Sequence, residues 1–327
     1  MADAATLSER GIPGRARHSL LDRLRDGDEI AHLATLLFAC AILVIAGLLV
    51  LELFRNSGEA RHKFGWAFFF TSTWDPVAGQ FGALPFIYGT LITSAVALVL
   101  SVPLGVGAAI FLSELAPPRV SDALTFIIEL LAAVPSVIYG LLAVFALVPL
   151  LRDPIQPFLG RTLGFLPLFQ GPSYGVGFLA AGIILAIMVV PFIISISRES
   201  LLAVPNDQRE AALALGATRW ESTWHVVVPY ARLGIVGSIF LALARALGET
   251  MAVTMVIGNT PQIAASLFAP GYTIPAVIAN EFTEATSDIH LSALIELGLV
   301  LFLLTIVING FARLMVLATT RRGTTQP

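Results

Sequence analysis

The chain has 327 residues, of which 57% are hydrophobic and only 13% are charged, and its mean hydropathy is +0.85. A soluble domain carries about twice that share of charged residues, and this much apolar surface cannot be hidden in one globular core. Composition therefore predicts an integral membrane protein. The net charge of −3 says little about partners, and no basic patch argues for nucleic acid, so we expect no nucleic-acid partner.

The reactive residue types indicate neither an enzyme nor a metalloprotein. Cys40 is the single cysteine, so no intrachain disulfide can form, and it lies in an apolar run where it acts as a small hydrophobe. The five histidines have no metal-ligand spacing, and no nucleophile–base pattern stands out. We expect no catalytic residues and no metal.

Hydropathy predicts six membrane-spanning helices, each of about 20 residues or more. About 30 polar, Arg-rich residues come first, and we expect a retained cytoplasmic segment at 1–30 rather than a cleavable signal. An all-α permease domain then covers 31–317, and a cytoplasmic tail covers 318–327. The expected spans are 31–54, 86–115, 123–151, 175–197, 233–257 and 291–317.

The basic residues orient these spans. With the N-terminus inside, thirteen Lys and Arg residues lie on the cytoplasmic side, five lie outside, and Arg245 lies within a span. Because basic residues concentrate on the cytoplasmic side of membrane proteins, we expect a multi-pass protein of the plasma membrane with both termini in the cytoplasm. The aromatic segment 55–85 suits the outer interface. In the outer loop we expect Glu281, Glu284 and Asp288 to contact a delivery protein or solvent.

Pro135 and Ser136 fall within the expected third span. A proline there bends a helix and frees a backbone carbonyl, so these two residues are a possible helix break or gate. An ordinary packing kink is an equally good interpretation.

Residues 198–232 form the longest expected cytoplasmic connection, which contains the coupling segment 204–230, VPNDQREAALALGATRWESTWHVVVPY. Asn206 or Asp207 can cap a first helix, and Gly216 suits the left-handed position after its end. Thr218 and Glu221 match a capping box that opens a second short helix, which we expect Pro229 to end. The spacing predicts a helix–turn–helix on the cytoplasmic face, although a plain connecting loop is the alternative.

Within this segment, Glu210, Ala211, Ala212 and Gly216, followed by Val226, Val228 and Pro229, resemble the "EAA" signature of ABC importer permeases. Valines replace the isoleucine and leucine of that signature. The resemblance implies the ABC importer permease fold, with coupling helices that dock on a cytoplasmic ATPase. Lys63 is the only lysine and has no phosphate-binding loop around it, so ATP and Mg²⁺ belong to a partner and we expect no cofactor in this chain.

The run ARALGETMAVTMVIGN, residues 244–259, places Arg245 and Glu249 four residues apart in an apolar span. If the helix begins near 233, Arg245 lies roughly 18 Å deep, close to the midplane, where a charge is costly and seeks a partner. We expect both on one helical face with Thr250 close by, lining the pathway of an anion. A packing ion pair is the alternative.

The stretches RALGETMAV, LPFIYGTLITSAVALVLSVPLGVGAAIFLSE, ELLAAVPSVIYGL and APGYTIPAVIANEF resemble phosphate-specific ABC permeases over nearly the whole chain. The aromatic WAFFFTSTWDP favours the PstC-type subunit over the PstA-type. This resemblance, and not the residue chemistry, names phosphate as the cargo. It implies partnership with a PstA-type second permease, two ATPase subunits and an external phosphate-binding protein, in contact with membrane lipid. The alternatives are another oxyanion, such as sulfate or molybdate, and an ion-coupled transporter or channel.

Overall fold

The computed structural model describes residues 28–321, and the segments 1–27 and 322–327 lie outside the described residues. Contacts divide the chain after Glu52 into two units. The described part of the first unit is helix α2 (Asp28–Asn56) up to Glu52, an apolar helix with a mean hydropathy of 2.9 in its membrane-spanning window. Residues 28–30, expected in the N-terminal segment, belong to this helix.

Six helical segments of the described residues are long and apolar enough to cross a membrane, which confirms the predicted number. They are Ala31–Asn56, Leu84–Leu115, Ser136–Thr162, Phe178–Leu202, Arg219–Gly248 and Asp288–Leu314. Residues 28–321 contain no strand, only an isolated bridge between Asp75 and Gln80. The predicted all-α membrane fold is confirmed.

Several of these segments are built from more than one helix. The second span joins α4 (Leu84–Ile110) to the π-helix η2 (Phe111–Leu115). The third joins α6 (Ser136–Leu142), η3 (Ala143–Leu147), α7 (Val148–Leu150), η4 (Leu151–Ile155) and α8 (Gln156–Thr162). The fifth joins α11 (Arg219–Ser222), η6 (Thr223–Val227) and α12 (Val228–Gly248). The fourth is α9 (Phe178–Leu202), and the sixth lies in α15 (Asp288–Arg321), which includes residues 318–321 of the expected tail.

The third span differs most from its prediction at 123–151. Residues 118–132 form a separate helix, α5 (Pro118–Ala132), and the span itself begins only at Ser136. Val134 precedes Pro135, and a residue before proline is disfavoured in the α conformation, so the chain leaves the helix there. Pro135 has extended backbone angles, φ −58° and ψ 140°.

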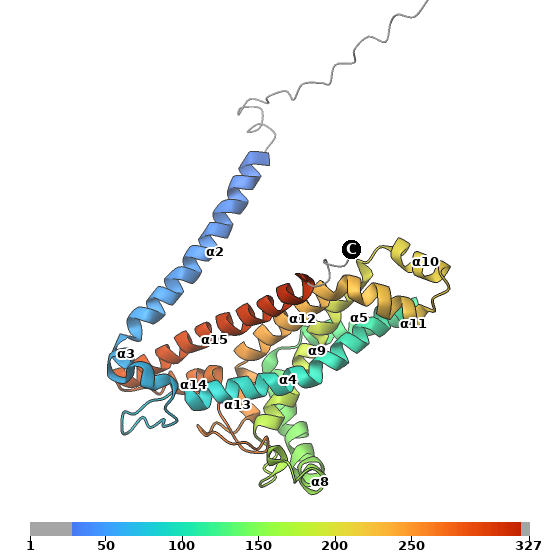
Figure 1. Cartoon of the computed structure of the whole chain (residues 1–327). Helices are drawn as coiled ribbons and strands as arrows, with labels where there is room; N and C mark the ends of the chain where they lie inside the picture. The colour runs from blue at the N-terminus through green and yellow to red at the C-terminus, as the bar shows by residue number, and fades with distance from the viewer. Residues whose placement is uncertain (1–27, 322–327) are drawn as a thin grey trace, which may run out of the picture. The chain divides into compact units, whose positions relative to one another are not determined.

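Helices α4 and α9 make the most extensive contact between described helices, and α12 packs on both (Figure 1). Small residues permit this approach: a Cβ on Gly105 of α4 would lie 2.7 Å from Ile193 of α9, and one on Gly182 of α9 would lie 2.4 Å from Val96 of α4. Close backbone approach at small residues is how helices associate in membranes, where apolar burial alone gives no preference over lipid.

A second core joins residues 57–86 to α14 (Ile274–Glu281) and α15. Helix α3 (Gly58–Phe64) and the 3₁₀-helix η1 (Gly65–Phe69) bring Phe68 to this core, and Phe68 is buried. The amide of Ala60 donates to the Ser292 hydroxyl at 3.0 Å, and Arg61 lies 3.6 Å from buried Glu296. Residues 55–85 are thus fastened to α15, while Trp66 remains exposed as an interfacial residue would be.

Candidate translocation site and coupling segment

The run that contains Arg245 and Glu249 is interrupted between these two residues. Helix α12 ends at Gly248, Glu249 is extended with φ −70° and ψ 127°, and α13 (Met251–Val256) begins after Thr250. The prediction that Arg245 and Glu249 share one helical face is therefore wrong. Gly248 and the β-branched Thr250 are weaker helix formers than alanine, and this favours a break here. Discontinuous helices inside membranes occur where protein or a cavity surrounds the freed backbone groups.

Arg245 lies in the last turn of α12 and is partly buried. Its guanidinium carbon is 4.2 Å from the centre of the Phe192 ring, and its Nε is buried without a hydrogen-bond partner among the described residues. The salt bridges of the described residues do not include Arg245. A cation held over a ring keeps its planar donors unused, so this side chain retains the capacity to bind an anion.

Glu249 and Thr250 instead form hydrogen bonds at the start of α13 and the end of α12, respectively. The Glu249 Oε1 atom accepts from the amide of Ala252 at 3.4 Å, in the first turn of α13. The Thr250 hydroxyl donates to the Gly248 carbonyl at 3.4 Å, and the Thr254 hydroxyl donates to the Thr250 carbonyl at 2.7 Å. The ion pair expected between Arg245 and Glu249 is not formed.

The break at Pro135 lies against the same region. Tyr139, in the first turn of α6, is buried and donates to the Leu131 carbonyl of α5 at 2.7 Å. Helix α13 packs on α6, where a Cβ on Gly140 would lie 2.5 Å from the sulfur of Met255. Two interrupted helices thus meet at the break that follows Arg245. The sequence analysis did not assign Phe192 to this site, because its contact with Arg245 has no local sequence signal.

The coupling segment is helical as predicted, with one different cap. Helix α10 (Asn206–Ala214) follows Pro205, and no side chain caps its start, so the expected cap by Asn206 or Asp207 is wrong. The Asn206 side chain instead accepts from Arg209 at 3.4 Å. At the other end Gly216 has φ +89°, which a glycine adopts without strain. The amides of Gly216 and Ala217 donate to Leu213 and Ala212, which is the Schellman arrangement.

Thr218 and Glu221 form the predicted capping box. The Glu221 amide donates to the Thr218 hydroxyl at 3.3 Å, and the Thr218 amide donates to the Glu221 carboxylate at 2.8 Å. The expected end at Pro229 is wrong, because α11 continues through η6 into α12. In η6 the amide of Val228 donates to the carbonyl of Thr223, five residues back, and this wider turn continues the helix as far as Pro229. Pro229 lies in the first turn of α12, where a proline without an amide donor is tolerated.

The signature residues lie mostly on an exposed face. Glu210, Ala211 and Gly216 are exposed, and Ala212 is partly covered. Leu215 is 90% exposed beside them. Figure 1 shows α10 and α11 beyond one end of the helices of the second unit, away from α8 and α14. An exposed, small-residue surface that ends in a bare leucine is suited to close docking of another protein.

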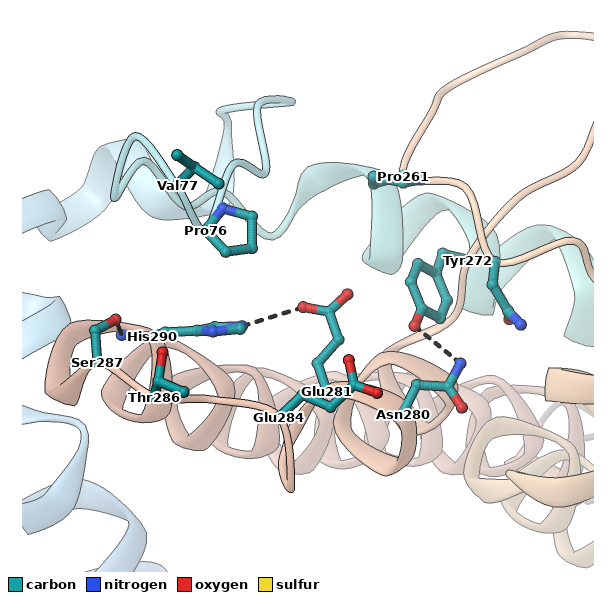
Figure 2. Close-up of a pocket in the computed structure, with 11 residues that line it drawn as sticks. Pro76, Val77, Pro261, Tyr272, Asn280, Glu281, Glu284, Thr286, Ser287 and His290 are labelled. Carbon is teal, nitrogen blue, oxygen red and sulfur yellow. Dashed lines mark hydrogen bonds and ion pairs between the residues drawn. The ribbon is translucent and has the colours of Figure 1, made fainter.

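At the opposite end a cavity of about 710 Å³ opens between the loop at Pro76 and the α14–α15 connection (Figure 2). Glu281 is held inside it, accepting from the Trp74 indole at 2.9 Å and lying 3.1 Å from His290 Nε2. Asn280 donates to the Tyr272 hydroxyl at 3.0 Å. Burial raises the pKa of Tyr272 to about 12, and the nearby carboxylates of Glu281 and Glu284 add to this. Glu281 is thus a bonded residue at the end of α14 and not a free loop carboxylate.

A sequence profile described as binding-protein-dependent transport system inner membrane component matches residues 101–321. The chain belongs to this family. Over 306 residues it is 47% identical to the "Phosphate transport system permease protein PstC" of Mesorhizobium japonicum, covering 92% of this chain and 94% of the relative. It is 46% identical over 305 residues to the protein of that name from Xylella fastidiosa, with 91% and 94% covered. A "Probable phosphate transport system permease protein PstC" of Methanocaldococcus jannaschii is 41% identical over 278 residues, with 82% and 88% covered.

Solved structures of importers share the fold of this permease family. A bacterial ABC transporter involved in the import of the acidic polysaccharide alginate aligns with a TM-score of 0.61 and 16% identity, covering 93% of this chain and 99% of that one. At this identity the likeness concerns the fold alone. The chain therefore has the predicted ABC importer permease fold.

Proposed function

We propose that this chain is a transmembrane permease subunit of an ATP-driven importer that moves inorganic phosphate across the plasma membrane. The observation that carries this proposal is the 47% identity to a phosphate transport permease over 92% of the chain. A likeness of this extent covers all six membrane segments and the coupling segment rather than one shared motif.

The chemistry around Arg245 is compatible with a phosphate pathway. A guanidinium offers a planar pair of donors to a tetrahedral oxyanion, and here no carboxylate of the described residues occupies those donors. Phosphate near neutral pH still carries a proton and can donate to a carboxylate such as Glu249, which fully ionised sulfate cannot do. Thr250 supplies a hydroxyl at the same break. We propose that Arg245, Glu249 and Thr250 line the path, with Pro135 and Ser136 at a second break that acts as a gate.

The coupling segment supplies the link to ATP. Glu210, Ala211, Ala212 and Gly216 would dock on a partner ATPase, which binds ATP and Mg²⁺ and performs the hydrolysis. We place this face and both termini in the cytoplasm, on the basic-residue distribution. The assembly would contain a PstA-type second permease, two ATPase subunits and an external phosphate-binding protein. A solved alginate importer is described in complex with a periplasmic protein that carries its substrate, which supports the last of these partners by analogy.

Reconstitution tests this function. The chain is assembled with the second permease and the ATPase in liposomes, loaded binding protein is added outside, and uptake of radiolabelled phosphate is followed with and without internal ATP. We expect ATP-dependent uptake that unlabelled phosphate suppresses and that equal sulfate or molybdate leaves unchanged. If sulfate or molybdate suppressed uptake more strongly than phosphate, that oxyanion would be the cargo in place of phosphate. Uptake that persists without the ATPase would favour the ion-coupled transporter.

A further inference from the structure

The side chain of Arg209, directly before the Glu210–Gly216 signature, is turned into the permease. Of the nine residues of α10, only Arg209 and Ala212 are partly buried, and the other seven are exposed. These two positions are three residues apart and so lie on one face of the helix, while Glu210 and Ala211 lie on the exposed faces. Helix α10 therefore has an inner face centred on Arg209 and an outer face that carries the signature.

Arg209 forms a two-pronged ion pair with Glu114 of η2, at the end of the α4 segment. Its Nε is 3.1 Å from Glu114 Oε2, and a terminal nitrogen is 2.9 Å from Oε1. Only 18% of the Arg209 side chain and 9% of the Glu114 side chain are exposed. Paired, parallel hydrogen bonds of this kind fix the relative orientation of two groups as well as their distance.

The same guanidinium closes the end of α9. It donates to the Leu201 carbonyl at 2.8 Å and to the Val204 carbonyl. The last four carbonyls of a helix have no partner inside that helix, and an arginine that reaches them complements both their unused acceptors and the negative end of the helix dipole. One side chain thus binds α10, α9 and the end of the α4 segment together.

A neighbouring contact ties the same corner to α5. Arg198 of α9 donates to the Ser121 hydroxyl at 3.2 Å, and Ser121 donates to the Leu112 carbonyl of η2 at 2.8 Å. The end of the α4 segment is therefore held by α9 through one arginine and by α10 through the other. Because α9 carries Phe192 and packs on α12, a displacement at this corner reaches the surroundings of Arg245.

We propose that Arg209 and Glu114 are a positioning pair that transmits the movement of the coupling helix to α4 and α9. This inference rests on the proposed ATP-driven function. The covalent path from α9 to α10 is the short segment Ala203–Pro205, and the ion pair adds a direct side-chain link from α10 to the end of the α4 segment. Removing one member of a buried pair also leaves the other charge without compensation, which loosens the corner further.

The test measures coupling in the complete importer. Glu114→Gln and Arg209→Lys are assembled with the partner subunits in liposomes, and phosphate imported per ATP hydrolysed is compared with the unmodified complex, together with the amount of assembled complex. We expect assembly to be retained and the phosphate-to-ATP ratio to fall by about 3- to 30-fold, the range typical of a residue that carries coupling. Glu114→Asp, which keeps a carboxylate, should recover part of the ratio.

Glu199→Gln and Arg232→Lys are the matched controls, because both residues are exposed and lie on α9 and α12. They should keep the unmodified ratio. Reduced assembly with an unchanged ratio in the remaining complex would show a purely structural role and overturn the proposal, as would variants equal to the unmodified importer in both measurements. An unmodified complex that imports no phosphate would overturn the proposed function instead.

Discussion

At the scale of single residues, the central feature is that Arg245 forms no ion pair with a carboxylate of the described residues. Arg245 faces the Phe192 ring and has a buried, unpartnered Nε, while Glu249 binds the first turn of α13. If the two charges were paired, an anion would first have to break that pair. In the observed arrangement the arginine donors are unused, and the Phe192 ring lowers the cost of placing this charge in an apolar segment.

This separation of roles predicts the effect of Glu249→Gln. The amide keeps an acceptor for Ala252 but no longer repels a fully ionised oxyanion, so we expect discrimination between phosphate and sulfate to fall by about tenfold, the worth of one charged hydrogen bond. Inhibition of phosphate uptake by sulfate measures it. Asp122→Asn, at an exposed position of α5, is the control. Unchanged uptake and unchanged sulfate inhibition in Glu249→Gln would contradict the assigned role.

Sequence could single out Arg245 and Glu249, because two charges in an apolar run are unusual whatever their geometry. It could not predict their separation. A spacing of four residues implies a shared face only if the helix is continuous, and the break at Glu249 depends on the packing of α13 against α6. Phe192 could not be found from the sequence for the same reason, since its contact with Arg245 joins segments far apart in the chain.

At the scale of elements, predictions were correct where both partners of an interaction lie close together in the sequence. Gly216 in a Schellman turn and Thr218 with Glu221 in a capping box involve residues three to five positions apart, and both predictions are confirmed. Predictions of helix ends were wrong where the end depends on contacts that the local sequence does not show. Asn206 does not cap α10, because Arg209, drawn inward by Glu114, also takes the Asn206 oxygen. Pro229 does not end its helix, because η6 widens the preceding turn.

The contact between α4 and α9 predicts different effects of the same substitution at two glycines of α4 that are two residues apart. A Cβ at Gly105 would lie 2.7 Å from Ile193, whereas nothing lies within 4 Å of a Cβ at Gly107. We expect Gly105→Leu to destabilise the permease by about 1–3 kcal/mol through overpacking, and Gly107→Leu to have little effect. Thermal unfolding of the purified protein in detergent measures this. Equal midpoints for the two variants would contradict the packing described for α4.

At the scale of the whole molecule, hydropathy predicted the number of spans, since the length needed to cross a bilayer leaves little freedom. The order of helices around Pro135 was not predictable, because the apolar stretch 123–151 contains Glu129 as its only charged residue and continues past Pro135, although its first part belongs to the separate helix α5. The orientation of the six segments stays a prediction from the basic residues, and it has a direct test.

The test uses two positions of nearly equal exposure at opposite ends of the second unit. Val77 is 99% exposed and Leu215 is 90% exposed. After Cys40, the only cysteine, is changed to serine, a single cysteine is introduced at one position or the other. A membrane-impermeant maleimide should label Val77→Cys in intact cells and Leu215→Cys only after the membrane is opened. The reverse pattern would place α10 outside and would remove the basis for docking an ATPase on it.

The π-helix η3 has a consequence for the spacing of residues along the third span. Tyr139, Ala143 and Leu151 are all buried. In an unbroken α-helix, at about 100° per residue, Leu151 would be rotated by about 120° from Tyr139, but the one additional residue in η3 reduces this to about 20°. The residues between η3 and η4 are thus in phase with Tyr139 only at the present length. A one-residue gap in this stretch would turn the following buried side chains towards lipid, so residue count constrains this span as strictly as apolar composition does.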